Sequence, residues 1–223
     1  MKVRITEGQF KRKFSAMKEG FRLDMLTSAT SFKQRLAYCR EMLGDPIGEG
    51  SSRIVFRIDD ETVLKLAKNG KGIAQNLEEI RLGTEPYLSS FPKIMNGTDE
   101  NNGLWIIGEN VMTATEEYFS DVLGMQFKEM QEYIWAVFMS SKKGNNKQAD
   151  DIIHHCYAKY EQNDDVMDLL NDIYELCFGF NNDIGDLRNI KNWGMCNRNG
   201  RTTMVILDPG FSNEIRDKYY SRR

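Results

Sequence analysis

The chain has 223 residues and a formal net charge of -3, and 40% of its residues are hydrophobic while 28% are charged. These values exclude a fibrous or disordered chain, and this length can bury one substantial core, so we expect a single two-lobed domain. The slightly negative charge argues against a protein whose main task is to neutralise nucleic-acid phosphates.

No segment approaches the roughly 18 apolar residues needed to cross a bilayer, and the N-terminus lacks the apolar stretch of a secretory signal. The four cysteines are scattered and form no C-x-x-C pair, which argues against a zinc site or a redox dithiol. We therefore expect a cytoplasmic protein with no membrane partner and no nucleic-acid partner.

The first half of the chain is predicted to be rich in strands. Apolar residues at helical spacing predict two leading helices, over residues 8–20 and 31–43. Two β-branched runs, residues 54–58 and 62–67, are separated by a turn-like Asp-Asp-Glu and predict a hairpin. Apolar residues at i, i+4 and i+7 then predict a helix over residues 70–82 with one apolar face.

Residues 93–111 complete the strand-rich first half as another hairpin, because Asn-, Asp- and Gly-rich turn residues separate two hydrophobic runs.

The second half is predicted to be mostly helical. Helical patterns cover residues 115–123, 126–141, 147–160 and 164–178. Short strands over residues 193–197 and 203–208 follow, joined by an Asn-Arg-Asn-Gly-Arg turn.

The first candidate motif is a G-x-G turn that runs directly into a strand. Gly48 and Gly50 are followed by Ser51, by Ser52 and, within the strand, by Val55. Glycines in such a turn let the backbone approach a phosphate, and its N–H groups can meet anionic oxygens. Taken alone, the motif fits a hairpin turn without a ligand better than it fits a phosphate-binding loop.

The second motif is a lysine, Lys65, in the middle of the apolar run 62–67. A buried ammonium requires a partner, because its desolvation alone costs several kcal/mol. The predicted helix over residues 70–82 offers Glu79, or its neighbour Glu78, as the carboxylate. The competing interpretation is a lysine that reaches solvent from an edge strand.

Two late loops supply acidic and amide side chains. After the last long helix, Asp186 can orient a nucleophilic hydroxyl and accept its proton, and Asn192, six positions later, can hold a metal ion. Asn189 is a rival metal ligand. Asp208 ends a buried-type strand beside a Pro-Gly turn, where a carboxylate is well placed to bind magnesium that bridges phosphates. Each loop alone matches a solvated turn, and it is their joint order that favours a nucleotide site.

This order of motifs resembles the protein-kinase-like superfamily, in particular its small phage-encoded and bacterial members and its aminoglycoside-phosphotransferase-like branch. The resemblance covers residues 46–211. It implies that ATP and Mg²⁺ are the cofactors, that Asp186, Lys65 and Glu79 are catalytic, and that Asn192 and Asp208 bind the metal. It further implies that the nucleotide is bound by Gly48, Gly50, Ser51, Ser52, Val55, Lys65, Glu109 and Val111.

The chain also departs from the family pattern. Arg53 replaces the third glycine of the loop, Ile184 and Gly185 replace the histidine and arginine of the catalytic loop, and Pro209 replaces the phenylalanine of the Asp-Phe-Gly signature. The missing arginine argues against control by an activation segment. These losses favour an alternative function, a pseudokinase that serves as a binding or regulatory module, whereas the retained lysine, aspartates and asparagine favour an enzyme.

We therefore predict an α+β fold of the two-lobed, protein-kinase-like type. A helical extension over residues 1–45 precedes a kinase-like domain over residues 46–223, with a small sheet-rich N-lobe over 46–111 and a truncated helical C-lobe over 112–223. The predicted activity is ATP- and Mg²⁺-dependent phosphoryl transfer, with a protein hydroxyl favoured as acceptor and a small molecule as the alternative. The motif style is typical of a phage or bacterial protein, and a phage protein would act in the host cytoplasm.

Overall fold

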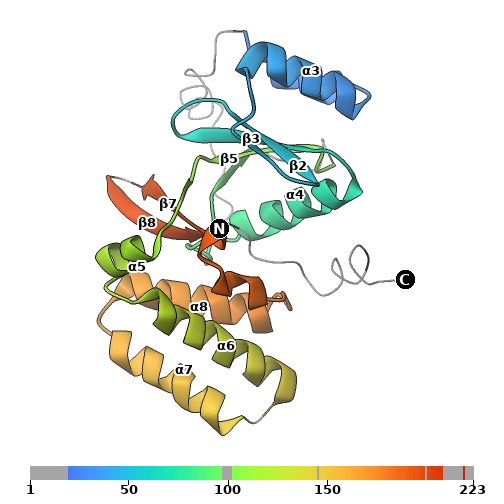
Figure 1. Ribbon diagram of the computed structural model, residues 1–223. Coiled ribbons are helices and arrows are strands. Elements are labelled where there is room, and N and C mark those ends of the chain that lie inside the picture. Colours follow the sequence, from blue (N-terminus) through green and yellow to red (C-terminus); the bar gives the residue numbers. More distant parts are fainter. Residues whose placement is uncertain (1–19, 97–101, 145, 199, 208–217, 219–223) are drawn as a thin grey trace. The chain divides into compact units, whose positions relative to one another are not determined.

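The computed structural model describes residues 20–96, 102–144, 146–198, 200–207 and 218 (Figure 1). Residues 8–19 of the predicted leading helix and Asp208 lie outside these residues. The chain divides into two compact units. The first unit contains Met1–Leu77 and Met95–Asn110, and the second contains Glu78–Ile94 and Val111–Arg223.

The first unit is built on a five-stranded sheet in the order β1-β2-β3-β5-β4. The pairs β1–β2, β2–β3 and β3–β5 are antiparallel, which confirms the predicted hairpin of two β-branched runs. Strand β4 lies beside β5, as the predicted hairpin over residues 93–111 requires. The strands are β1 (Gly48–Glu49), β2 (Arg53–Arg57), β3 (Thr62–Ala67), β4 (Ile94–Asn96) and β5 (Trp105–Glu109).

One face of this sheet is covered by the helices that precede it, α2 (Leu23–Ser28) and α3 (Phe32–Leu43). Ser31 begins α3 through a capping box with Gln34, which explains why the predicted helix starts there. Alternate strand residues point to this face and form one buried apolar cluster with the helices. The cluster consists of Phe21, Leu26, Cys39, Leu43, Ile54, Phe56, Ile58, Leu64, Leu66, Trp105 and Ile107.

The helix after β3, α4 (Gly70–Gly83), begins in the first unit and ends in the second, because the division between the units falls after Leu77. It confirms the helix predicted over residues 70–82. Its first half is fastened to the sheet by Asn76, which is fully buried and donates to the carbonyl of Gly103 at 2.8 Å.

The second unit is mainly helical, as predicted (Figure 1). Asn or Thr side chains cap α5, α7 and α8 by accepting N–H groups of their first turns, which sets the starts of these helices near the predicted residues. Two short 3-10 turns, η2 and η3, follow α8. The helical elements are α5 (Glu116–Leu123), α6 (Phe127–Lys143), α7 (Lys147–Tyr160), α8 (Asp164–Phe178), η2 (Gly185–Arg188) and η3 (Ile190–Asn192).

A three-stranded antiparallel sheet, β6 (Met112–Thr113), β7 (Trp193–Arg198) and β8 (Arg201–Ile206), completes this unit. Trp193 is fully buried and packs edge-on against Phe119, with ring centroids 5.0 Å apart. Its indole N–H donates to the carbonyl of Leu187 at 2.7 Å, so the core also fixes η2. The sheet-rich first unit and the helix-rich second unit confirm the predicted α+β class.

The described residues contain no helix long and apolar enough to cross a membrane. The four cysteines are buried and form no disulfide. Burial raises the pKa of the Cys39 thiol to about 12 and that of Cys156 to about 11, so both groups stay protonated at neutral pH.

A buried carboxylate, Asp172 on α8, anchors the loop that precedes β4. It is 4% exposed, and its Oδ2 accepts the N–H groups of Ser89 at 2.9 Å and Ser90 at 2.7 Å. The carbonyl of Ser90 in turn accepts the N–H of Ile206 at 2.7 Å, which links this loop to β8. Burial raises the pKa of Asp172, although hydrogen bonds from Ser90 and Ser89 partly offset this effect.

Substitutions of Asp172 are expected to alter the pH dependence of stability. The pKa of Asp172 is higher in the folded protein than in the unfolded chain, where it is about 3.9. As the pH rises from the unfolded pKa through the folded pKa, the unfolded chain therefore loses its proton first, and the protein becomes less stable. The free energy of unfolding of the unsubstituted protein, relative to Asp172→Asn, should fall over that window and then level off. Asp172→Ala should cost about 1–3 kcal/mol, since the buried N–H of Ser90 and the part-buried N–H of Ser89 lose their acceptor. Urea unfolding measures the free energies of unfolding of the unsubstituted protein and of both variants. If the unsubstituted protein and Asp172→Asn differed by the same free energy at every pH, the assigned pKa shift would be wrong.

Candidate active site

The glycine turn between β1 and β2 presents backbone donors that no described residue accepts. The N–H of Gly50 donates to the carbonyl of Arg53 at 2.9 Å, whereas those of Ser51 and Ser52 donate to no residue that the structure describes. The hydroxyl of Ser52 is buried and donates to Gln75 Oε1 on α4. Two adjacent N–H groups are therefore available to an anionic ligand.

The glycines of this turn are not required by the turn's own packing. A Cβ at Gly48 or Gly50 would come no closer than 3.8 Å to any described heavy atom, and neither residue has a positive φ. In contrast, a Cβ at Gly72 would lie 2.1 Å from the carbonyl oxygen of Ser52, and one at Gly103 would lie 2.9 Å from a backbone oxygen. Gly72 and Gly103 are thus needed by the fold, while a Cβ at Gly48 or Gly50 would make only ordinary van der Waals contacts.

Lys68 is a basic residue of this turn that the sequence prediction missed. Its Nζ donates to Glu49 Oε1 at 2.8 Å and to the carbonyl of Gly50 at 3.1 Å, and its N–H donates to the carbonyl of Ser52 at 2.7 Å. The hydrogen bond from Lys68 lowers the pKa of Glu49. The hairpin itself was the available signal, because antiparallel pairing brings the residue after β3 to the turn before β2.

Lys65 lies at the middle of β3 and is partly buried. It pairs with Val55 and Ile106, so its side chain projects from the face opposite the α2–α3 cluster. Strand β3 lies inside the sheet, between β2 and β5, and the interpretation of Lys65 as an edge-strand lysine is therefore wrong. Asn76 Nδ2 donates to the carbonyl of Lys65 at 3.4 Å, which holds α4 against this strand.

The two glutamates considered as partners of the strand lysine have different surroundings. Glu78 is 6% exposed, and its carboxylate accepts both Nε (2.9 Å) and Nη2 of Arg81 and Nδ2 of Asn182 (2.9 Å). Glu79 is half-buried and lines, with Leu207, a cavity of about 10 Å³. The carboxylate of Glu78 is therefore engaged within the second unit by Arg81 and Asn182.

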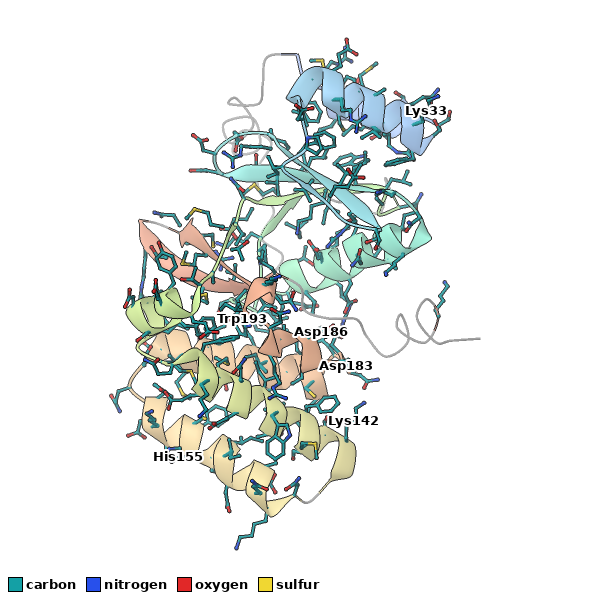
Figure 2. All side chains as sticks on the ribbon, viewed as in Figure 1. Lys33, Lys142, His155, Asp183, Asp186 and Trp193 are labelled. Carbon is teal, nitrogen blue, oxygen red and sulfur yellow. The ribbon has the colours of Figure 1, made fainter. Side chains whose placement is uncertain are left out.

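Asp186 on η2, a predicted catalytic residue, and Asn192 on η3, a predicted metal ligand, lie close together and are joined by a hydrogen bond. The carbonyl of Asp186 accepts the N–H of Asn189 at 3.0 Å and Nδ2 of Asn192 at 2.7 Å. Oδ1 of Asn189 accepts the N–H of Lys191 at 3.1 Å, whereas Oδ1 of Asn192 accepts no hydrogen bond from the described residues. The Asp186 side chain is exposed, and Figure 2 shows it beside Asp183 on the turn.

Turn η3 is also joined to the end of β8. The N–H of Leu207 donates to the carbonyl of Asn192 at 2.8 Å, so the chain just before Asp208 lies against the turn. Asp208, the second predicted metal ligand, lies outside the described residues. Within the described ranges, no three His, Cys, Asp or Glu side chains come together in a way that could hold a metal ion.

An open hollow of about 400 Å³ lies beside Asp186. Gln131 of α6 forms part of its wall and donates from Nε2 to the carbonyl of Arg188 at 2.8 Å, which fixes η2 against the helix. The hollow is lined by Glu116, Phe127, Gln131, Gly185, Asp186, Arg188, Asn189 and Ile190. A hydroxyl compound that enters it would reach the Asp186 carboxylate.

The segment predicted to meet the adenine ring crosses from one unit to the other. Glu109 pairs with Thr62 at the end of β5, and the N–H of Asn110 donates to the β2–β3 turn at 2.7 Å. Val111 belongs to the second unit, where its side chain leaves no space for a Cβ on Gly194. Glu109 and Val111 are therefore held by different units.

The structure thus brings the predicted site residues together in two groups. In the first unit, Gly48, Val55 and Lys65 form one row across three paired strands. In the second, a hydrogen bond joins Asp186 to Asn192. The first unit holds Gly48, Gly50, Ser51, Ser52, Val55, Lys65 and Glu109, and the second holds Glu79, Val111, Asp186 and Asn192.

The glycine geometry predicts opposite effects of alanine at two positions. Gly50→Ala should change the free energy of unfolding by about 0.5 kcal/mol or less, because the new methyl group meets no atom closer than ordinary van der Waals contact. Gly72→Ala should destabilise by about 1–3 kcal/mol or more, since backbone atoms must move. Chemical denaturation of the two variants provides the measurement, and equal losses would show that Gly50 has a structural role after all.

Comparisons with known proteins add little to this geometry. No protein-family model matches the chain, and no curated protein matches it. A search of solved structures finds similarity to "Structure of the streptomycin-ATP-APH(2")-IIa ternary complex", with 16% sequence identity over 80% of this chain and 77% of that chain. The TM-score of that match is 0.30, which is too low to support an inference about fold or activity.

Proposed function

We propose that the protein is an ATP- and Mg²⁺-dependent phosphotransferase that transfers a phosphoryl group to a hydroxyl. One observation carries the proposal: hydrogen bonds join Asp186 on η2 to Asn192 on η3, and Asn192 to Leu207, the residue before Asp208. Phosphoryl transfer depends mainly on positioning and on charge stabilisation, and these contacts gather the side chains suited to both tasks.

The first unit offers a site that fits the phosphates of a nucleotide. The N–H groups of Ser51 and Ser52 donate to no described residue, and the lack of a side chain at Gly48 and Gly50 suits a turn that a phosphate approaches. Lys65 projects from the sheet face opposite the buried α2–α3 cluster and is suited to contact the α- and β-phosphates, braced by Glu79. The proposal requires Lys65 and Asp186 to reach the same triphosphate.

In the second unit, each side chain receives a separate task. Asp186 orients the acceptor hydroxyl and takes its proton as the oxygen attacks the γ-phosphorus and the bond to the β–γ bridging oxygen breaks. Oδ1 of Asn192 and the carboxylate of Asp208 would hold Mg²⁺, which neutralises phosphate charge when bound. We choose Asn192 over Asn189, because the Asn189 oxygen already accepts a backbone N–H.

The acceptor is the least defined part of the proposal. A protein hydroxyl is the acceptor expected from the sequence, and a small molecule is the second choice. The hollow of about 400 Å³ beside Asp186 has room for either a single side chain or a compact ligand. Action in a bacterial or phage-infected cytoplasm remains a prediction.

Replacing Lys65 or Asp186 is expected to abolish most transfer without unfolding the protein. Lys65→Met and Asp186→Asn should each lower the rate by about 100-fold or more, because they remove charge from the reacting centre. The measurement is transfer from radiolabelled ATP, including autophosphorylation, with nucleotide binding followed by thermal shift. Lys33→Met on α3 and Asp151→Asn on α7 are matched controls that should leave the rate unchanged.

The outcome of this assay separates the candidate functions. Transfer that depends on Lys65 and Asp186 supports the enzyme. Binding of ATP without transfer supports the pseudokinase, and full transfer by both variants refutes the assigned roles.

The choice between the two asparagines has its own test. Asn192→Ala should raise the Mg²⁺ concentration needed for half-maximal transfer by about 10-fold, since it removes an oxygen ligand. Asn189→Ala should leave that concentration unchanged, because its side chain caps η3 instead. Mg²⁺ titration of the transfer rate distinguishes them, and the reverse pattern would assign the metal to Asn189.

A further inference from the structure

The middle of helix α4 makes side-chain hydrogen bonds with segments that carry residues of the proposed site. In the first unit, Gln75 accepts the hydroxyl of Ser52 in the glycine turn, and Asn76 donates to the carbonyl of Lys65. In the second unit, Glu78 accepts from Asn182, which directly precedes Asp183 and the turn that bears Asp186. Gln75, Asn76 and Glu78 lie within about one turn of this helix.

The Glu78–Asn182 contact is a buried one. Glu78 is 6% exposed and Asn182 is 3% exposed. Arg81 completes the group: its guanidinium pairs with the Glu78 carboxylate, and its Nη2 lies 3.3 Å from Oδ1 of Asn182. Each of the three side chains therefore contacts the other two.

The backbone around Asn182 is held by further interactions besides the contact with Glu78. The N–H of Asn182 donates to the carbonyl of Leu176 at 2.9 Å, and the preceding residue, Asn181, has a φ of 55°, in the left-handed region. One residue further on, Asp183 accepts the N–H of Gly185 at 3.1 Å. The path from the end of α8 to η2 is thus defined at successive residues, and Asn182 supplies its side-chain contact to α4.

A second contact attaches α4 to the same segment. The guanidinium of Arg81 lies 4.5 Å from the ring centroid of Phe180, which in turn stacks on Tyr87 with ring centroids 6.4 Å apart. Arg81 therefore contacts the segment after α8 on both sides of Asn181. A cation over an aromatic ring adds a further attraction between helix and loop.

We propose that Asn182 and Glu78 are positioning residues that set the place of the Asp186 turn against the second half of α4. The predicted fall in kcat rests on the proposed phosphotransferase function. A displacement of about 1 Å in a catalytic group is enough to lower a rate by about 100-fold, so loss of the Asn182 contact acts on the chemical step.

The test uses substitutions that reverse the polarity of the contact. Asn182→Asp places a second carboxylate beside Glu78 and should lower kcat by about 10- to 100-fold, with KM for ATP changed by about 2-fold or less. Adding Glu78→Gln should restore most of kcat, because the amide introduced by that substitution donates where Asn182 did and Arg81 can pair with the new carboxylate.

Asn163→Ala is the matched control for loss of stability. Asn163 caps the start of α8 and donates to the carbonyl of Leu123 at 2.8 Å. It lies about 22 Å from the end of α8 that precedes Asn182, as the rise per residue of the helix gives. This variant should lower the melting temperature while leaving kcat per folded molecule unchanged. An equal fall of kcat in Asn163→Ala and Asn182→Asp would overturn the proposal.

Hydrogen exchange of residues 183–192 keeps the proposal testable without activity. Asn182→Asp should speed exchange there, and the double variant with Glu78→Gln should reverse the change, while Asn163→Ala should not alter it. If the protein transfers no phosphate, the proposed function fails, but this exchange pattern still supports the positioning role. Unchanged exchange in Asn182→Asp, or no rescue by Glu78→Gln, would overturn it.

Discussion

The carboxylate of Glu78 is buried, and a buried charge is stable only when it is paired and fully hydrogen-bonded. In this protein the partners come from two segments far apart in sequence, Arg81 on the same helix and Asn182 after α8. The charge is therefore satisfied only when the segment after α8 is in place. This requirement links correct folding of α4 to correct placement of the turn that carries the proposed catalytic aspartate.

The same principle recurs at other joints of the structure. Asn76 is fully buried and bonds to the backbone on both β3 and the segment before β5, while Asp172 accepts two N–H groups of the loop before β4. Each of these polar groups joins segments of the same unit by hydrogen bonds. Such bonds fix the relative position of the segments more closely than apolar contacts do. In the first unit Asn76 joins α4 to β3 and to the segment before β5, and in the second Asp172 joins α8 to the loop before β4.

Much of the fold could be predicted from local patterns, because apolar periodicity and capping residues act over a few positions. Helices α3 to α8 and strands β2, β3, β7 and β8 follow the predicted ranges closely. The position of Lys65 also followed from its strand. The roles of Lys68 and Glu78 were not found, since they depend on strand register and on a contact across about 100 residues of chain. Neither the hollow beside Asp186 nor the pairing of β6 with β7 has a local sequence signal.

Helices α2 and α3 precede the sheet in the chain, yet the apolar cluster that they form with it includes Trp105 and Ile107 of β5. During synthesis the ribosome must therefore add about 60 residues after α3 before that cluster can be completed, which takes roughly 3 to 13 seconds at ordinary elongation rates. Throughout that interval the nascent segment exposes residues such as Leu26 and Leu43. Chaperones that recognise short apolar stretches have their natural target here, at the beginning of translation.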